Sequence, residues 1–145
     1  MEKVSRIRLG VNIDHVATLR NARGTFYPDP LRMVKILEKI RVDGITLHLR
    51  EDRRHIIDTD VIRIIKETNL PVNLEMAATE EMLSIATDLV PNAVCLVPER
   101  REERTTEGGL DVISEEEKLK SFLRPLAEKK IRISLFVSPE LKQIE

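Results

Sequence analysis

The sequence contains a single cysteine, Cys95, so an internal disulfide and a cysteine-rich zinc site are both excluded. It has no tryptophan and only 3% aromatic residues, too few for the stacking platforms that bind single-stranded nucleic acids. The net charge is only -1, without the basic excess that nucleic-acid-binding and membrane-surface proteins usually carry. We therefore expect no nucleic-acid partner, and we expect Cys95, which lies in an apolar run, to be a buried and unreactive thiol.

Long apolar stretches are also missing. No run approaches the ~20 residues that a membrane-spanning helix needs, and the opening residues MEKVSRIRLG lack the apolar core of a signal peptide. We therefore expect a cytoplasmic protein without a membrane partner. The length of 145 residues suits one domain, and no linker or low-complexity segment divides it.

Short strand patterns alternate with helical patterns along the chain. Strands are predicted at 7–13, 44–49, 71–76, 93–97 and 131–137. Helices are predicted at 28–41, 58–68, 80–90 and 114–130, with a further helix that starts near residue 139. This alternation is typical of βαβ units and predicts a parallel α/β fold.

Capping signals set the predicted helix boundaries. Asp29 precedes a proline and is a typical N-cap, and Thr79 is a second one. Ser114 and Glu117 have the spacing of a capping box. Pro125 lies inside the last long helical pattern and is expected to kink or split that helix. The apolar stripe of the first predicted helix comprises Leu31, Val34, Ile36, Leu37 and Ile40.

Polar side chains gather where the predicted strands end. They are Asn12, Asp14 and His15 after the first strand, His48 and Arg50 on the second, Asn73 and Glu75 on the third, and Arg100, Arg101, Arg104 and Thr105 after the fourth. In parallel α/β folds, ligands bind at the carboxyl ends of the strands. We therefore interpret this edge of the sheet as a candidate site.

Each of these groups also has a purely structural interpretation. His48 lies on the strand face opposite its leucines, and an isolated histidine there also fits a core residue bonded to the backbone. The arginine-rich stretches 50–54 and 100–104 also fit solvated loops. Glu75 is harder to explain structurally, because an unpaired buried carboxylate is costly; it is either paired or has a raised pKa that suits acid–base chemistry. The meeting of all these groups at one edge favours a site.

The same residue types raise the question of a metal. Aspartate, histidine and glutamate together can bind a cation. However, no His-x-His or His-x-x-x-His pair supplies neighbouring ligands, and arginines at the same edge would repel a cation. Arginines instead suit phosphates, which they bind through bidentate contacts. The residues therefore indicate an acid–base site for a phosphorylated small molecule, without a metal.

Six ordered segments carry a resemblance to a known family: GVNIDHVATLRNARGT, HLREDRRHI, NLEMA, TEEM, LVPERREERTTEGGLDV and ISLFV. Together they resemble the pyridoxine 5′-phosphate synthase family of vitamin B6 biosynthesis, from about Arg8 to Val137. The resemblance implies a TIM barrel with additional helices and a homo-octamer. It also implies condensation of 1-deoxy-D-xylulose 5-phosphate with 3-amino-2-oxopropyl phosphate, with release of phosphate and water and without a redox cofactor or essential metal.

The resemblance also implies roles for individual residues. Asn12 and Arg23 match contacts to the aminoketone phosphate, and Asp14 and His15 match residues that bind the sugar phosphate or shape the site around it. Arg50, His55 and Thr105 match contacts to the deoxyxylulose phosphate. His48 and Glu75 match two proton acceptors, which suits a condensation and dehydration that need repeated proton transfers.

The length departs from the family pattern. A TIM barrel has eight βα units in about 250 residues, whereas this pattern contains about five. We therefore expect residues 1–145 to form a single incomplete barrel domain, truncated at the C-terminus. Its first and fifth strands would be open edges, and its apolar interior faces would lack partners. Such a chain is expected to be marginally folded or self-associated, and to have little activity alone.

Two other interpretations stay open from the sequence. One is a non-catalytic sugar-phosphate-binding fragment or assembly subunit. The other is a complete flavodoxin-like domain with an unrelated binding role. The strand order separates the last interpretation from a barrel, because a flavodoxin-like sheet has its first strand in the centre, whereas a barrel keeps its strands in sequence order.

Overall fold

The computed structural model describes residues 6–99 and 108–145. One parallel sheet contains β1 (Gly10–Asn12), β2 (Gly44–His48), β3 (Val72–Met76), β4 (Ala93–Leu96) and β5 (Arg132–Leu135). The helices are α1 (Asp14–Arg23), α2 (Pro30–Lys39), α3 (Asp58–Glu67), α4 (Glu80–Leu89), α5 (Glu116–Glu128) and α6 (Leu141–Ile144). The predicted parallel α/β class is confirmed, and each strand is shorter than predicted by up to three residues at one or both ends.

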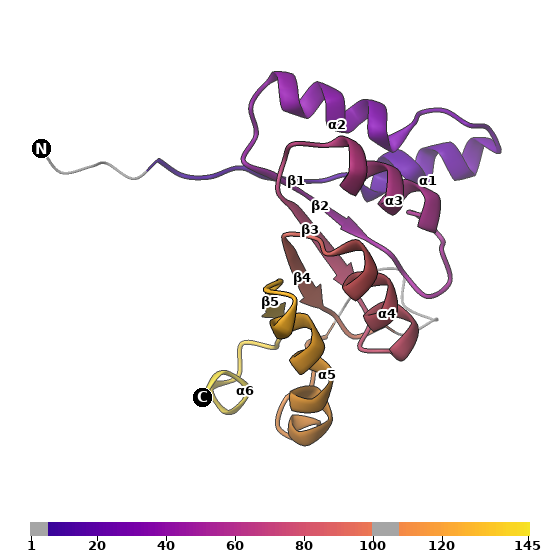
Figure 1. Cartoon of the computed structure of the whole chain (residues 1–145). Coiled ribbons are helices and arrows are strands. Elements are labelled where there is room, and N and C mark those ends of the chain that lie inside the picture. Colours follow the sequence, from indigo (N-terminus) through magenta and orange to yellow (C-terminus); the bar gives the residue numbers. More distant parts are fainter. Residues whose placement is uncertain (1–5, 100–107) are drawn as a thin grey trace, which may run out of the picture.

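The strand order is β1-β2-β3-β4-β5, the same as the order along the chain. This order contradicts the flavodoxin-like interpretation, in which β1 would lie between two other strands. It agrees with part of a TIM-barrel type fold, in which each strand pairs with the next one. In Figure 1, α2, α3, α4 and α5 follow the sheet along an arc on its outer side. β1 and β5 are the two edges of the sheet, as predicted.

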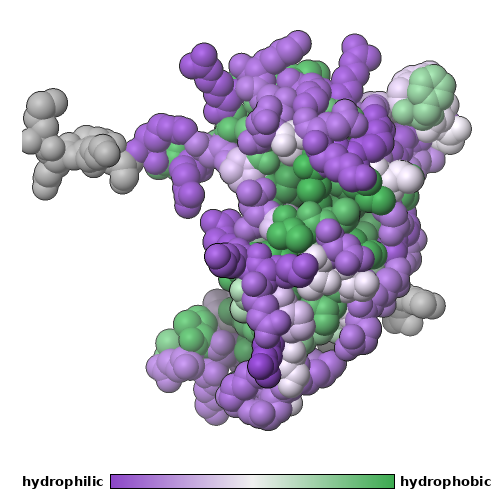
Figure 2. Space-filling model, in the orientation of Figure 1, coloured by the Kyte–Doolittle hydropathy of each residue, from purple (hydrophilic) through white to green (hydrophobic). Residues whose placement is uncertain are grey.

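The helices cover one face of the sheet, and the core lies between them and the strands. Successive strand residues point to opposite faces, and in β2 Ile45 and Leu47 point to the helix side, where they are buried. Other fully buried side chains from strands and helices join them: Leu74, Met76, Leu96, Val34, Ile64, Met82 and Leu126. Each such residue stabilises the fold by roughly 1.5–3 kcal/mol on burial. Figure 2 shows hydrophilic side chains over the helices with apolar ones between them.

The other face of the sheet is polar, so the prediction of an apolar interior face is wrong for the described strands. Thr46 pairs in register with Asn73, and His48 with Glu75, which in turn pairs with Cys95. Cys95 is only half-buried, in contrast to the prediction of a buried thiol, and burial raises the pKa of that thiol. Because this face carries functional groups instead of packing residues, the core depends on the helix side alone.

Two of the predicted N-caps are confirmed. The Asp29 side chain accepts a hydrogen bond from the Leu31 N–H at 3.1 Å, and Thr79 Oγ1 accepts one from the Met82 N–H at 3.4 Å. The Ser114 capping box is wrong, because α5 is preceded by Glu115, without a side-chain cap. Pro125 does not split α5, which continues through it to Glu128.

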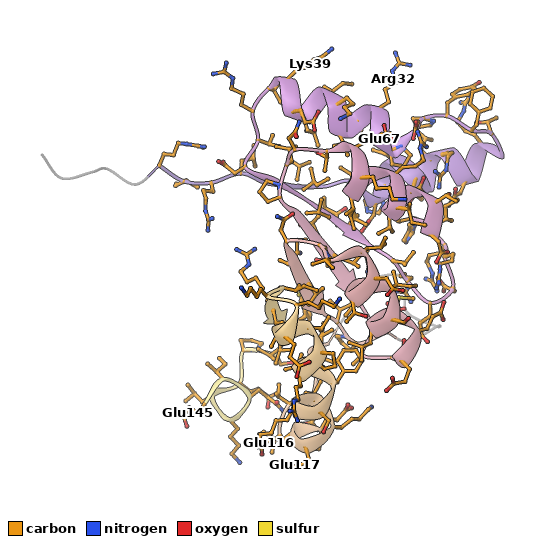
Figure 3. The ribbon with its side chains drawn as sticks, in the orientation of Figure 1. Arg32, Lys39, Glu67, Glu116, Glu117 and Glu145 are labelled. Atoms are coloured by element: carbon orange, nitrogen blue, oxygen red, sulfur yellow. The ribbon has the colours of Figure 1, made fainter. Side chains whose placement is uncertain are left out.

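The apolar stripe of α2 is narrower than predicted. Leu31, Val34 and Leu37 are buried, whereas Ile36 is 46% exposed and Ile40 is 64% exposed. The buried residues are spaced three apart, which keeps them on one face of the helix. Charged side chains project outward from the helices, among them Arg32 and Lys39 on α2, Glu67 on α3 and Glu116 and Glu117 on α5 (Figure 3). Within the described ranges, no helix combines the length and the apolar character that crossing a membrane requires.

Helix α1 was not predicted. Its buried positions are Asp14, Ala17 and Arg20, so its inward face carries two charged residues and shows no apolar stripe. Gly24 ends the helix at φ 63°, a left-handed conformation that favours glycine, and its N–H bonds back to the Asn21 carbonyl. The helix follows β1 directly, which brings its first turn to the edge where the polar strand ends lie.

Candidate functional site

The strand register brings three predicted residues together at the carboxyl ends of β1, β2 and β3. His48 and Glu75 are register partners on the polar face of the sheet. Asp14 begins α1 immediately after β1, and it is buried with 8% exposure. One ligand atom from each of these three side chains lies within 4.8 Å of the others. The cluster of Asp14, His48 and Glu75 is therefore the centre of the candidate site.

Asp14 holds the end of β1 against β2. Its Oδ1 accepts a hydrogen bond from the His48 backbone N–H at 2.7 Å, and its Oδ2 accepts one from Asn12 Nδ2 at 2.9 Å. The Asn12 side-chain oxygen in turn accepts from the Asp14 N–H at 2.9 Å. Both oxygens of this buried carboxylate are thus satisfied by protein groups, which fixes the position of the His48 backbone.

Glu75 lies half-buried beside this pair. Burial raises the pKa of its carboxyl group above the ordinary value of 4.5; the charge on His48 opposes this shift, and the charge on Asp14 adds to it. Burial disfavours the ionised form of a carboxyl group that has no full set of partners. This environment matches the alternative in which Glu75 has a raised pKa and is suited to exchanging protons.

The three-residue cluster has the dimensions of a cation site, which the sequence spacing did not reveal. The ligands come from helix α1 and from strands β2 and β3, so no short sequence pattern contains them. Asp14 already accepts hydrogen bonds through both oxygens. Arg50, two residues after His48, is buried, and its positive charge disfavours a cation nearby. These hydrogen bonds account for the position of the Asp14 carboxylate without an ion, and the absence of a metal stays a prediction.

The loop after β2 carries two more of the predicted residues. Arg50 is buried with 4% exposure, and its Nε lies 3.6 Å from Asp52 Oδ1. His55 Nδ1 lies 2.7 Å from Thr18 Oγ1 of α1, and its ring packs edge-on against the ring of His15 at 5.9 Å between centroids. Burial lowers the pKa of His55. Helix α1 and the loop thus present two imidazoles and a guanidinium at the same edge.

A buried ion pair fixes this loop to α1. Arg20 donates to both carboxylate oxygens of Asp60, at 2.7 and 2.9 Å, and both residues are at most 8% exposed. Arg20 also donates to the His55 carbonyl at 3.4 Å, and Asn21 Nδ2 donates to the same carbonyl at 2.9 Å. Asp60 Oδ2 accepts a further bond from the Ile57 N–H at 3.1 Å. The backbone that carries His55 is therefore held from several directions.

Not every predicted residue joins the cluster. Arg23 ends α1, about 14 Å along the helix axis from Asp14. It is exposed, and its guanidinium lies 5.0 Å from the centroid of the Tyr27 ring. Thr105, together with Arg100, Arg101 and Arg104, lies outside the described residues.

Glu99, three residues after β4, belongs to the site but was not predicted. Its Oε1 lies 2.7 Å from His48 Nε2, and its Oε2 accepts a hydrogen bond from the Glu51 N–H at 3.1 Å. Burial alone would raise the pKa of this carboxyl group, but the hydrogen bonds from His48 and Glu51 and the charges of His48 and Arg50 together lower it. Its place after a strand end was the available signal, and the surrounding charged loop concealed it.

Comparison with known proteins agrees with the resemblance seen in the motifs. The family model described as pyridoxal phosphate biosynthesis protein PdxJ matches residues 9–145. The chain belongs to this family. The matched range includes Asp14, His48 and Glu75, whose ligand atoms the fold brings within 4.8 Å of one another.

Relatives named pyridoxine 5′-phosphate synthase match the chain closely. The protein of Ruegeria pomeroyi is 57% identical over 142 residues, which cover 98% of this chain and 57% of that protein. The protein of Rhodospirillum rubrum is 59% identical over 139 residues, 96% of this chain and 56% of the relative. The protein of Zymomonas mobilis is 60% identical over 139 residues, which cover 96% of this chain and 54% of that protein. The chain thus spans a little over half the length of these curated relatives.

The buried Arg20–Asp60 ion pair should contribute more to the free energy of unfolding than the more exposed Arg53–Asp58 pair does. Asp60→Ala leaves the Arg20 guanidinium buried and unpaired, so we expect the free energy of unfolding to fall by about 3–5 kcal/mol. The control is Asp58→Ala, which removes the half-exposed partner of Arg53 and should cost less than about 1 kcal/mol. Urea denaturation followed by circular dichroism measures both; equal losses would contradict the assigned importance of the Arg20–Asp60 pair.

Glu75 should make stability depend on pH. Its pKa is raised in the folded state, so the folded protein binds this proton more tightly than the unfolded chain does. The resulting stabilisation is complete below pH 4.5, the ordinary pKa, and is lost as the pH rises through the raised folded value. The glutamine side chain of Glu75→Gln does not titrate. We therefore expect the free energy of unfolding of this variant, relative to that of the wild type, to increase as the pH rises from below 4.5 to neutrality.

Urea denaturation of the wild type and of Glu75→Gln across that pH range measures this difference. The exposed Glu80→Gln substitution on α4 is the control, since its carboxyl group faces solvent. A stability difference between Glu75→Gln and the wild type that stays constant over the whole range would contradict a raised pKa of Glu75.

Proposed function

We propose that this chain contains the substrate-binding and proton-accepting part of a pyridoxine 5′-phosphate synthase. The observation that carries the proposal is the cluster of Asp14, His48 and Glu75 beside the buried Arg50, in a chain of this family. The reaction would condense 1-deoxy-D-xylulose 5-phosphate with 3-amino-2-oxopropyl phosphate and release phosphate and water. Such a condensation needs an acceptor for protons close to a binding site for phosphate.

The proposed proton acceptors are His48 and Glu75. They are register partners on one face of the sheet, so a single bound intermediate can reach both. A carboxyl group with a raised pKa takes and returns a proton near neutral pH more easily than an ordinary glutamate, because its two protonation states lie closer in free energy there. This property supports a role for Glu75 in ring closure, in which protons are removed and returned repeatedly.

The proposed contacts to the deoxyxylulose phosphate are Arg50, His55 and Thr105. A buried guanidinium suits this role because arginine binds phosphate through parallel hydrogen bonds, which are stronger away from water. Asp14 and His15 would bind the sugar portion or shape the site around it, and Asn12 and Arg23 would contact the aminoketone phosphate. The substrates would thus be recognised mainly by charge at the ends of β1 and β2.

We also propose that the protein works as a homo-oligomer in the cytoplasm, and that residues 1–145 belong to one barrel domain. The open edges of the sheet at β1 and β5 support association with further strands, because unpaired strand edges readily pair with other chains. The second candidate function is a sugar-phosphate-binding fragment without turnover. The buried guanidinium of Arg50 and the His55 ring beside Thr18 also fit binding of a phosphate without turnover.

Turnover and assembly should be measured together. We expect the purified chain to bind 1-deoxy-D-xylulose 5-phosphate. If it also forms pyridoxine 5′-phosphate, Glu75→Gln should lower kcat by about 10²–10⁴-fold, because a proton acceptor is lost. Light scattering gives the molar mass of the species that is active. Glu80→Gln is the matched control, because it makes the same change on the solvent side of α4.

Binding without product would favour the fragment over the complete enzyme. Failure to bind the sugar phosphate at all would contradict both functions. Full activity of Glu75→Gln would contradict the role of Glu75 as a proton acceptor.

A further inference from the structure

Glu99 connects the ends of two strands at the centre of the site. One carboxylate oxygen lies 2.7 Å from His48 Nε2, and the other accepts the Glu51 N–H at 3.1 Å. The Glu99 and His48 side chains are only 5% and 9% exposed. A charge-assisted hydrogen bond that is shielded from water in this way is strong and geometrically specific.

The contact distinguishes the two nitrogens of the His48 ring. In a neutral imidazole one nitrogen carries hydrogen and the other accepts, and the hydrogen-bond partner of one nitrogen decides the state of the other. An ionised carboxylate only accepts hydrogen bonds. If Glu99 is ionised, the hydrogen must therefore be on Nε2, and the lone pair must be on Nδ1.

The two carboxyl groups near His48 have opposite environments. Hydrogen bonds from His48 and Glu51 lower the pKa of Glu99, whereas burial raises the pKa of Glu75. A pair of acidic groups whose environments separate their pKa values usually divides the roles of fixed charge and proton carrier. Glu99 has the environment of the fixed charge. Asp14 also faces this region, but its oxygens are engaged by the His48 backbone and by Asn12.

We propose that Glu99 is a positioning residue for His48: its carboxylate holds the hydrogen on Nε2 and leaves Nδ1 as the nitrogen that accepts the substrate proton. The inference rests on the proposed function for the identity of the substrate and for the role of His48 as a proton acceptor. In the proton transfer, a substrate bond to hydrogen breaks, its electron pair stays on the substrate, and a new N–H bond forms at Nδ1. The resulting imidazolium then lies 2.7 Å from the negative charge of Glu99, which stabilises it.

The first test is the protonation state of His48 in the wild-type chain. The chain contains only three histidines, so labelling them with ¹⁵N gives few ring signals, and His48→Gln assigns the relevant one. At about pH 8, above the ordinary titration range of imidazole, we expect a hydrogen on Nε2 that exchanges slowly with water, and an unprotonated Nδ1. The opposite tautomer, with the hydrogen on Nδ1 alone, would overturn the proposal without any variant.

The second test compares two Glu→Gln substitutions. In Glu99→Gln the partner of Nε2 is neutral, so the Nε2–H proton should move upfield and exchange faster with water. Glu51→Gln is the matched control: the Glu51 side chain is exposed and only its backbone N–H contacts Glu99, so the wild-type His48 spectrum should be retained. Identical His48 spectra in wild type and Glu99→Gln would overturn the proposal.

Kinetics separates this proposal from the proposed function. If the chain turns over its substrates, we expect Glu99→Gln to lower kcat by about 10–100-fold, the usual effect of removing a group that orients a functional histidine. KM should change much less, because Glu99 does not contact the substrate in this proposal. An unchanged kcat would overturn it. If no variant has activity, the synthase proposal fails, while the NMR result still decides the role of Glu99.

Discussion

The hydrogen bond from the His48 backbone to the Asp14 carboxylate is the contact on which the candidate site depends. It joins the end of β1 to the end of β2 at 2.7 Å, and it fixes the start of α1 at the same point. Because Asp14 is buried, removal of its carboxyl group would leave the His48 N–H and the Asn12 amide without their acceptor. With this contact in place, the parallel register brings Glu75 beside His48, and α1 brings Thr18 and Arg20 against the loop of His55.

The two faces of the sheet differ in composition and in role. The helix side of the sheet is closely packed and apolar, with residues such as Leu47, Leu74 and Leu96 fully buried. The opposite side is lined by Thr46, Asn73, Glu75 and their neighbours, which contribute little to the core. Functional groups can occupy this face because the helices already stabilise the strands from behind. The same separation explains why a charged helix face, that of α1, lies at the site and is stabilised by an ion pair in place of apolar contacts.

Much of the fold could be predicted from the sequence, because alternating strand and helix patterns are local. The five strands, the caps at Asp29 and Thr79 and the parallel class follow from such patterns. Helix α1 could not be predicted in this way, since its inward face carries Asp14 and Arg20. The sequence also indicated that polar residues at strand ends, such as His48 and Glu75, lie together, because parallel strands end at one edge of the sheet. The contacts of Glu99 with His48, of Arg20 with Asp60 and of Thr18 with His55 join residues 37 to 51 positions apart, and no local spacing encodes them.

The most direct measurement of the central claim uses the histidines as probes of substrate binding. All three histidines, His15, His48 and His55, lie at the carboxyl ends of β1 and β2 or in the loop that follows. Titration of ¹⁵N-histidine-labelled chain with 1-deoxy-D-xylulose 5-phosphate should shift the ring signals of His48 and His55 in a saturable manner. Inorganic phosphate is the control and should shift them less. If the sugar phosphate leaves both rings unchanged, the strand-end cluster is not its binding site, and the assignment of these residues is wrong.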